Sequence, residues 1–93
     1  MAYRIELSRP AARDVKAIRD KAAKLAIRRA IEALAEEPFP RRAKKLRGLP
    51  DIWRLRVGDW RVVYAVEGER LVVLVLMIGG RGDVYARLQR RLG

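Results

Sequence analysis

Hydrophobic residues stand at every second position of residues 53–57 and 60–64, on both sides of the Gly-Asp pair at 58–59. Side chains of a β-strand point alternately to the two faces of a sheet, and Gly-Asp suits a two-residue turn, so the pattern predicts an antiparallel hairpin. In this register Arg56 lies opposite Arg61. One face carries six hydrophobic side chains and the other carries three arginines: Trp53, Leu55, Val57, Trp60, Val62 and Tyr64 against Arg54, Arg56 and Arg61.

Two further segments have the pattern of strands. Residues 3–7 alternate apolar with charged residues and predict a half-buried first strand. Residues 71–78 are apolar throughout, which is typical of a central strand covered on both faces. Residues 79–82 contain three glycines, and we expect a flexible loop there.

Helical patterns occupy the region between the first strand and the hairpin. Ser8 stands at an N-cap position and Pro10 lies in the first turn, which predicts a short helix. Residues 21–36 carry hydrophobic residues at helical spacing and predict a second helix. Because residues 19–22 contain neither Gly nor Pro, one continuous bent helix is an alternative to two helices.

Together these elements predict one α+β domain over residues 1–93. An N-terminal strand leads into a two-helix hairpin, and an antiparallel three-stranded meander completes a small sheet. Asp83 is expected to cap a short C-terminal helix over residues 84–92.

The composition excludes several kinds of chemistry. The chain has no Cys and no His, so we expect no disulfide, no thiolate nucleophile, no imidazole acid–base pair and no Cys-based metal site. The commonest zinc ligand is also absent, and we expect neither a bound metal nor a cofactor. A net charge of +11 favours an anionic partner, which is nucleic acid, an acidic protein or an anionic membrane. The N-terminus lacks the apolar stretch of a signal peptide, and residues 71–78 are too few to span a membrane. We expect a cytoplasmic protein, and no membrane among its partners.

The arginine face of the hairpin is a candidate binding site. Arg56 opposite Arg61 places like charges together, which destabilises a sheet and would suit a bound polyanion. A solvated arginine face is the alternative interpretation. Since neighbouring strands run antiparallel, the end of the strand over residues 71–78 lies beside the hairpin turn. Arg81 and Tyr85 follow that end, and we expect them near Arg56 and Arg61.

Three motifs resemble the RelE branch of the RelE/ParE toxin superfamily. They are KLRGLPD at residues 45–51, WRVVY at residues 60–64, and an apolar run that ends in IGGRGDVY at residues 78–85. The resemblance extends over nearly the whole chain. It implies the toxin of a type II toxin–antitoxin pair, a ribosome-dependent endoribonuclease that cleaves mRNA in the A site. It also implies a RelB-like antitoxin as partner, in a toxin–antitoxin hetero-oligomer.

The same resemblance implies an active site of Arg54, Arg56, Arg61, Arg81 and Tyr85. The implied reaction is attack of a ribose 2′-hydroxyl on the adjacent phosphate, which needs no metal. Arg61 and Arg81 are expected to clamp the phosphate. Arg54 and Arg56 are expected to orient the RNA backbone and stabilise charge. Tyr85 is expected to orient the 2′-hydroxyl, accept its proton, or stack on a base.

A basic segment precedes the hairpin, with five cations in residues 41–47. We expect these side chains to contact RNA or the ribosome. They are Arg41, Arg42, Lys44, Lys45 and Arg47.

Two features depart from the family pattern. Relatives often carry Lys at one or both of the positions of Arg54 and Arg56, and commonly His or Lys at that of Gly80. Arginine stays protonated in proteins and is a poor general base. The identity of the general base therefore stays open.

Two other functions are compatible with the sequence. A ParE-like protein would have the same fold and inhibit DNA gyrase without being a nuclease. The five-residue site argues for the nuclease, whereas the weak supply of a general base argues the other way. A plain basic RNA-binding module would bind RNA in a salt-sensitive manner without cleaving it.

Overall fold

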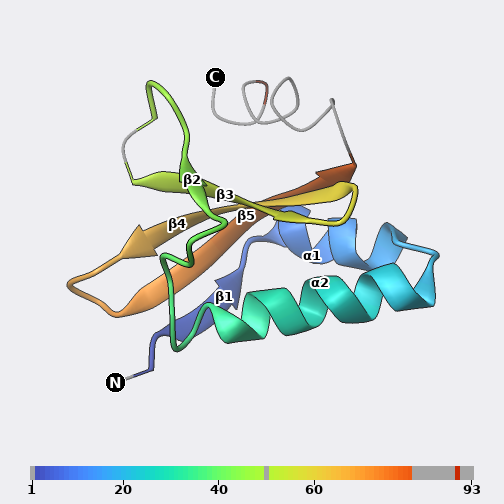
Figure 1. The fold of residues 1–93 in the computed structure, drawn as a ribbon, viewed down its shortest axis with the longest axis horizontal. Helices are drawn as coiled ribbons and strands as arrows, with labels where there is room; N and C mark the ends of the chain where they lie inside the picture. The colour runs from blue at the N-terminus through green and yellow to red at the C-terminus, as the bar shows by residue number, and fades with distance from the viewer. Residues whose placement is uncertain (1, 50, 81–89, 91–93) are drawn as a thin grey trace.

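Two helices cover one face of a five-stranded mixed sheet (Figure 1). The computed structural model describes residues 2–49, 51–80 and 90. The strands are ordered β1-β5-β4-β3-β2; β1 runs parallel to β5, and the other neighbouring pairs are antiparallel. This arrangement confirms the predicted α+β class. In chain order the elements are β1 (Arg4–Leu7), α1 (Arg9–Ala17), α2 (Lys21–Ala33), β2 (Lys44–Lys45), β3 (Ile52–Val57), β4 (Trp60–Glu67) and β5 (Val72–Gly80).

The hairpin of β3 and β4 has the predicted register, with Arg56 opposite Arg61 and Leu55 opposite Val62. Gly58 takes a φ of 61° in the turn, a left-handed conformation that glycine adopts readily. The hydrophobic face of the hairpin packs against the helices and forms the main core. Its buried members include Leu55, Val62 and Tyr64, together with Ile27 and Ile31 of α2 and Leu34 at the C-cap of that helix.

The central strand β5 is covered on both faces, as predicted. The expected loop over residues 79–82 is wrong in its first half, because Gly79 and Gly80 continue β5 and pair with β4. A bulge interrupts that pairing. Val63 pairs with Met77 but the next residue of β4, Tyr64, pairs with Val75, which makes Leu76 the extra residue.

The helical region forms two helices, not one bent helix. The amide of Ile18 bonds to the carbonyl of Val15 and ends α1, and the carboxylate of Asp20 accepts bonds from two amides at the start of α2. An aspartate cap thus separates the helices without Gly or Pro. Helix α2 ends at Ala33, earlier than the predicted residue 36, in a turn that precedes Pro38.

The sheet has one strand more than predicted. The two residues of β2 pair antiparallel with β3 at the edge, and two residues are too few to show an alternating pattern. Leu46, which follows β2, joins Val63 and Met77 in a second small core. Since Val63 is adjacent in the strand to Val62, this second core lies on the sheet face opposite the helices.

Ser8, the N-cap of α1, and Asp14 within α1 continue the hydrogen bonding of β5 beyond β1. The pairing of β1 with β5 ends at Leu7 and Val75. The Oγ of Ser8 then donates to the carbonyl of Leu76 (3.1 Å), and the Oδ2 of Asp14 accepts from the amide of Ile78 (2.9 Å). These bonds hold the end of β5 that carries Gly79 and Gly80.

The predicted C-terminal helix over residues 84–92 lies, apart from Arg90, outside the described residues. Neither described helix combines the length and the apolar character needed to cross a membrane.

Tyr64 connects the sheet to the segment that follows α2. Its ring is fully buried, and its hydroxyl donates to the carbonyl of Pro38 (2.8 Å). Burial disfavours the phenolate and raises the pKa of Tyr64 to about 12. Phe39 packs its ring against Trp53 with the centroids 4.9 Å apart, which fixes the same segment to β3.

Replacing Tyr64 tests this connection. Tyr64→Phe is expected to lower the free energy of unfolding by about 1 kcal/mol, because one buried hydrogen bond is lost. The raised pKa means that the folded state holds its phenolic proton while the unfolded state loses it above pH 10, so stability falls between pH 10 and 12. The variant is expected to show a shallower decline there, measured by urea unfolding at each pH. An equally steep decline in both proteins would contradict the assignment.

A second prediction concerns Ser8, which both caps α1 and bonds to β5. Ser8→Ala is expected to cost about 2 kcal/mol of unfolding free energy, because it removes a cap and a bond to the sheet. Asp20→Ala is the matched control, because it removes only the exposed cap of α2, and is expected to cost about 1 kcal/mol. Urea unfolding compares the two, and an equal cost would show that the bond to Leu76 contributes nothing.

Candidate anion-binding site

Arg56 and Arg61 form a like-charge pair on a rigid part of the sheet. They are directly opposite each other on β3 and β4, so their side chains leave the same face, the one away from the helices. The Nε of Arg56 donates to the carbonyl of Gly58 (3.1 Å) and is thereby held at the turn. On its other side Arg61 pairs with Gly79, which has no side chain to compete for space.

The guanidinium of Arg61 contains an unusual atom. Its Nη1 is buried and, among the described residues, is the one buried side-chain nitrogen or oxygen without a hydrogen-bond partner. Leaving a buried donor unpaired is costly, and more so for a charged group. A bound oxyanion would provide the missing acceptor.

Arg56 also lines a hollow of about 460 Å³ over β2 and β3, together with three further cationic side chains. Lys44 pairs with Arg54 across the two strands, and Arg54 and Arg56 share a face because they are two residues apart. Among the residues that the structure describes, no carboxylate lines the hollow. Its lining is Arg42, Lys44, Arg54, Arg56 and Gly58.

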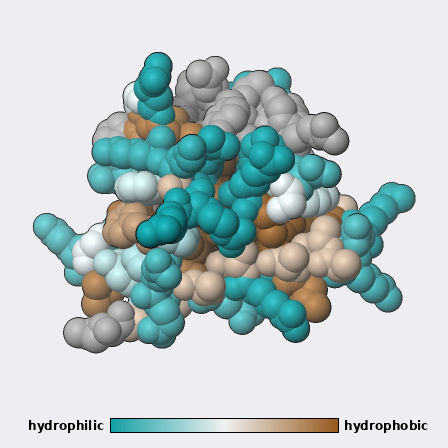
Figure 2. All heavy atoms as spheres, viewed as in Figure 1, coloured by the Kyte–Doolittle hydropathy of each residue, from teal (hydrophilic) through white to brown (hydrophobic). Residues whose placement is uncertain are grey.

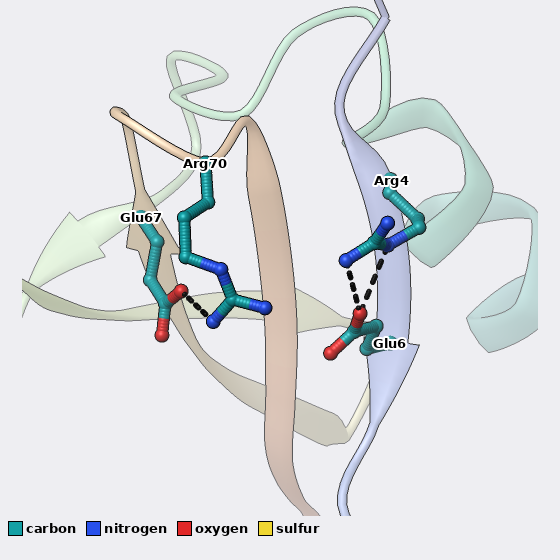
Figure 3. A network of polar contacts seen from close by, with 4 residues as sticks. All are labelled: Arg4, Glu6, Glu67 and Arg70. Carbon is teal, nitrogen blue, oxygen red and sulfur yellow. Dashed lines mark hydrogen bonds and ion pairs between the residues drawn. The ribbon is translucent and has the colours of Figure 1, made fainter.

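The described ion pairs lie at the other end of the sheet. Figure 3 shows Arg4 with Glu6 on β1 (2.8 Å) and Arg70 with Glu67 at the β4–β5 turn (2.6 Å). Both Arg4 and Glu67 pair with Val72 at the start of β5, whereas Arg61 pairs near its end. Within the described part of the chain, the arginines of the candidate site therefore have no ion-pair partner.

The structure brings together only part of the predicted site. Arg54, Arg56 and Arg61 share one face as expected, and Arg42 and Lys44 join them through β2, a strand that was not predicted. Arg41, Lys45 and Arg47 are exposed and do not line the hollow. Arg81 and Tyr85 lie outside the described residues, so their convergence on the arginine pair stays a prediction. Gly80, the residue before Arg81, pairs with Trp60 beside the hairpin turn.

The described side chains suit charge stabilisation better than proton transfer. Guanidinium groups donate hydrogen bonds in a fork that matches phosphate oxygens, but they do not give up a proton near neutral pH.

No cluster of three potential metal ligands occurs among the residues in the described ranges. Hydrophilic side chains occupy much of the molecular face shown in Figure 2.

Comparisons with known proteins identify the family. The family described as "ParE toxin of type II toxin-antitoxin system, parDE" matches residues 5–85. The mRNA interferase toxin RelE of Escherichia coli K12 is 41% identical over 54 residues, which are 54% of this chain and 57% of that protein. The match thus spans little more than half of that curated relative.

Solved structures support the same family. RelE in the RelE–RelB complex of Pyrococcus horikoshii superposes with a TM-score of 0.77 at 30% identity, covering 88% of this chain and 98% of that one. A free mutant of E. coli RelE superposes with a TM-score of 0.78 at 27% identity, covering both chains fully. The chain therefore belongs to the RelE/ParE superfamily of toxins from type II toxin–antitoxin systems.

Proposed function

We propose that this toxin is a metal-independent endoribonuclease that cleaves mRNA on the ribosome and so inhibits translation. The observation that carries the proposal is the buried, unpaired Nη1 of Arg61, a residue that lies directly opposite Arg56 in the hairpin. Curated relatives named mRNA interferases give independent support. A gyrase inhibitor would have no need of a phosphate-binding arginine pair at this position.

In the proposed reaction the ribose 2′-oxygen attacks the adjacent phosphorus and the bond from phosphorus to the 5′-oxygen breaks. The products are a 2′,3′-cyclic phosphate and a 5′-hydroxyl. The 2′-hydroxyl loses its proton to a base and the departing 5′-oxygen gains one, so protons balance. Negative charge builds on the phosphoryl oxygens in the transition state, where Arg61 would donate to them from Nη1.

The other predicted residues complete the proposal. Arg81 is the second phosphate clamp, and Tyr85 orients the 2′-hydroxyl or accepts its proton. Arg54 and Arg56 orient the RNA backbone and stabilise charge. Neighbouring cations would favour a phenolate, which is the direction required of a base.

We further propose a RelB-like antitoxin as partner, in a hetero-oligomer formed in the cytoplasm. The support is that structural neighbours of this chain include RelE proteins solved with RelB antitoxins. An acidic antitoxin that covers the unneutralised arginine face would inhibit the toxin, and the net charge of +11 would speed its association.

Replacing Arg61 tests the reaction. Arg61→Ala is expected to reduce ribosome-dependent mRNA cleavage roughly 100-fold or more, because a donor to the developing charge is lost. Arg19→Ala is the matched control, since Arg19 is exposed between the helices on the opposite side of the sheet. Cleavage is measured by mapping RNA ends, and thermal unfolding checks that both variants fold. Full cleavage by a folded Arg61→Ala variant would rule out the assignment.

The gyrase alternative predicts a different target. We expect induction of the toxin to produce cleaved mRNA with 5′-hydroxyl ends, and the purified chain to leave DNA supercoiling by gyrase unchanged. Removing ribosomes from the cleavage reaction is expected to abolish cleavage. Inhibition of supercoiling together with intact mRNA would instead support the ParE-like function.

A further inference from the structure

Two neighbouring rows of cations cross the sheet on the arginine face. Arg56 and Arg61 form one row on β3 and β4, and Lys44 and Arg54 form the other on β2 and β3. Arg42, which precedes β2, lines the hollow with Lys44, Arg54 and Arg56. Arg61 does not line this hollow, whereas Arg56 does. Arg56 therefore lies between Arg61 and the other cations of the hollow.

Electrostatics favours an anion in the hollow. Like charges directly opposite each other destabilise a strand pair, and Lys44 opposite Arg54 repeats the arrangement of Arg56 opposite Arg61. Lysine on an edge strand can serve simply to prevent association with other sheets. That role would not require Arg54, which is half-buried and pairs with Val63 of the second small core, to line the same hollow.

Strand geometry keeps the cations of the two rows within reach of one RNA backbone. The backbone of Arg54 lies roughly 7 Å from that of Arg56 along β3, and β4 with Arg61 lies about 4.8 Å beyond Arg56. Long arginine side chains on strands this close can contact neighbouring phosphates of a single extended strand. Positively charged grooves that track the backbone are the usual means of binding single-stranded nucleic acid.

We infer that the hollow over β2 and β3 is a second phosphate subsite, which binds the RNA phosphate next to the one at Arg61. This inference rests on the proposed function and deepens it. Arg42, Lys44 and Arg54 bind the neighbouring phosphate, and Arg56 contacts both. The preferred substrate is then single-stranded RNA with at least two consecutive charged phosphates.

The test measures binding of a short single-stranded RNA that carries 2′-O-methyl groups and cannot be cleaved. Affinity is followed by fluorescence anisotropy over a series of salt concentrations. The double variant Arg42→Ala/Lys44→Ala is expected to bind about tenfold more weakly. Its plot of log affinity against log salt is expected to be less steep by about 0.7, because one phosphate contact is lost. Thermal unfolding checks the fold of the variant.

Two control variants remove the same charge elsewhere. Lys16→Ala/Arg19→Ala lies on the exposed helical surface and is expected to keep the original slope. Arg41→Ala/Lys45→Ala alters the same segment outside the hollow and is expected to lose clearly less slope than Arg42→Ala/Lys44→Ala. Equal losses in all three variants would mean diffuse attraction and would overturn the subsite. Absence of RNA binding by the unaltered chain would overturn it as well.

A neutral methylphosphonate linkage, placed at each position of the RNA in turn, locates the subsite. The unaltered chain is expected to lose affinity at two adjacent linkages, and Arg42→Ala/Lys44→Ala to be insensitive at one of them. Loss at a single linkage in both proteins would contradict the inference. Because the RNA cannot be cleaved, a chain that binds as expected but never cuts mRNA would contradict the proposed function alone.

Discussion

Hydrogen bonding of β5 is the constraint on which the rest of the structure depends. β5 pairs with β4 on one side and with β1 on the other, and Ser8 and Asp14 bond to its backbone beyond the end of β1. The bulge at Leu76 then sets the register of its last residues. Without that extra residue Ile78 would stand opposite Arg61, and a bulky side chain would occupy the arginine face. With it, Gly79 faces Arg61 and Ile78 enters the main core.

Stability and binding are divided between the two faces of the sheet. The face toward the helices is hydrophobic and contributes most of the core. The opposite face carries a small core of Leu46, Val63 and Met77, with the arginines beside it. Unpaired like charges work against folding, so their retention on a rigid sheet is typical of a functional site that the core stabilises.

Charge is also sorted along the strands. Two exposed ion pairs lie near the start of β5, where each contributes little to stability, and the described arginines near its end have none. A polyanion approaching this surface is therefore attracted toward one end of the sheet. Such an arrangement favours rapid association with an anionic partner, which in the proposed function is RNA or an acidic antitoxin.

The sequence by itself determined the β3–β4 hairpin, the position of Arg54 and Arg56 on one face of β3, and the covered central strand. Alternation and apolar runs are local patterns, so they can be recognised without the fold. Ser8 and Pro10 likewise marked the start of α1. Only the tertiary structure decided that Lys44 and Arg42 lie beside Arg54, and that Gly79 lies opposite Arg61. A two-residue edge strand and a one-residue bulge leave no periodic signal, since both depend on which backbone groups pair across distant parts of the chain.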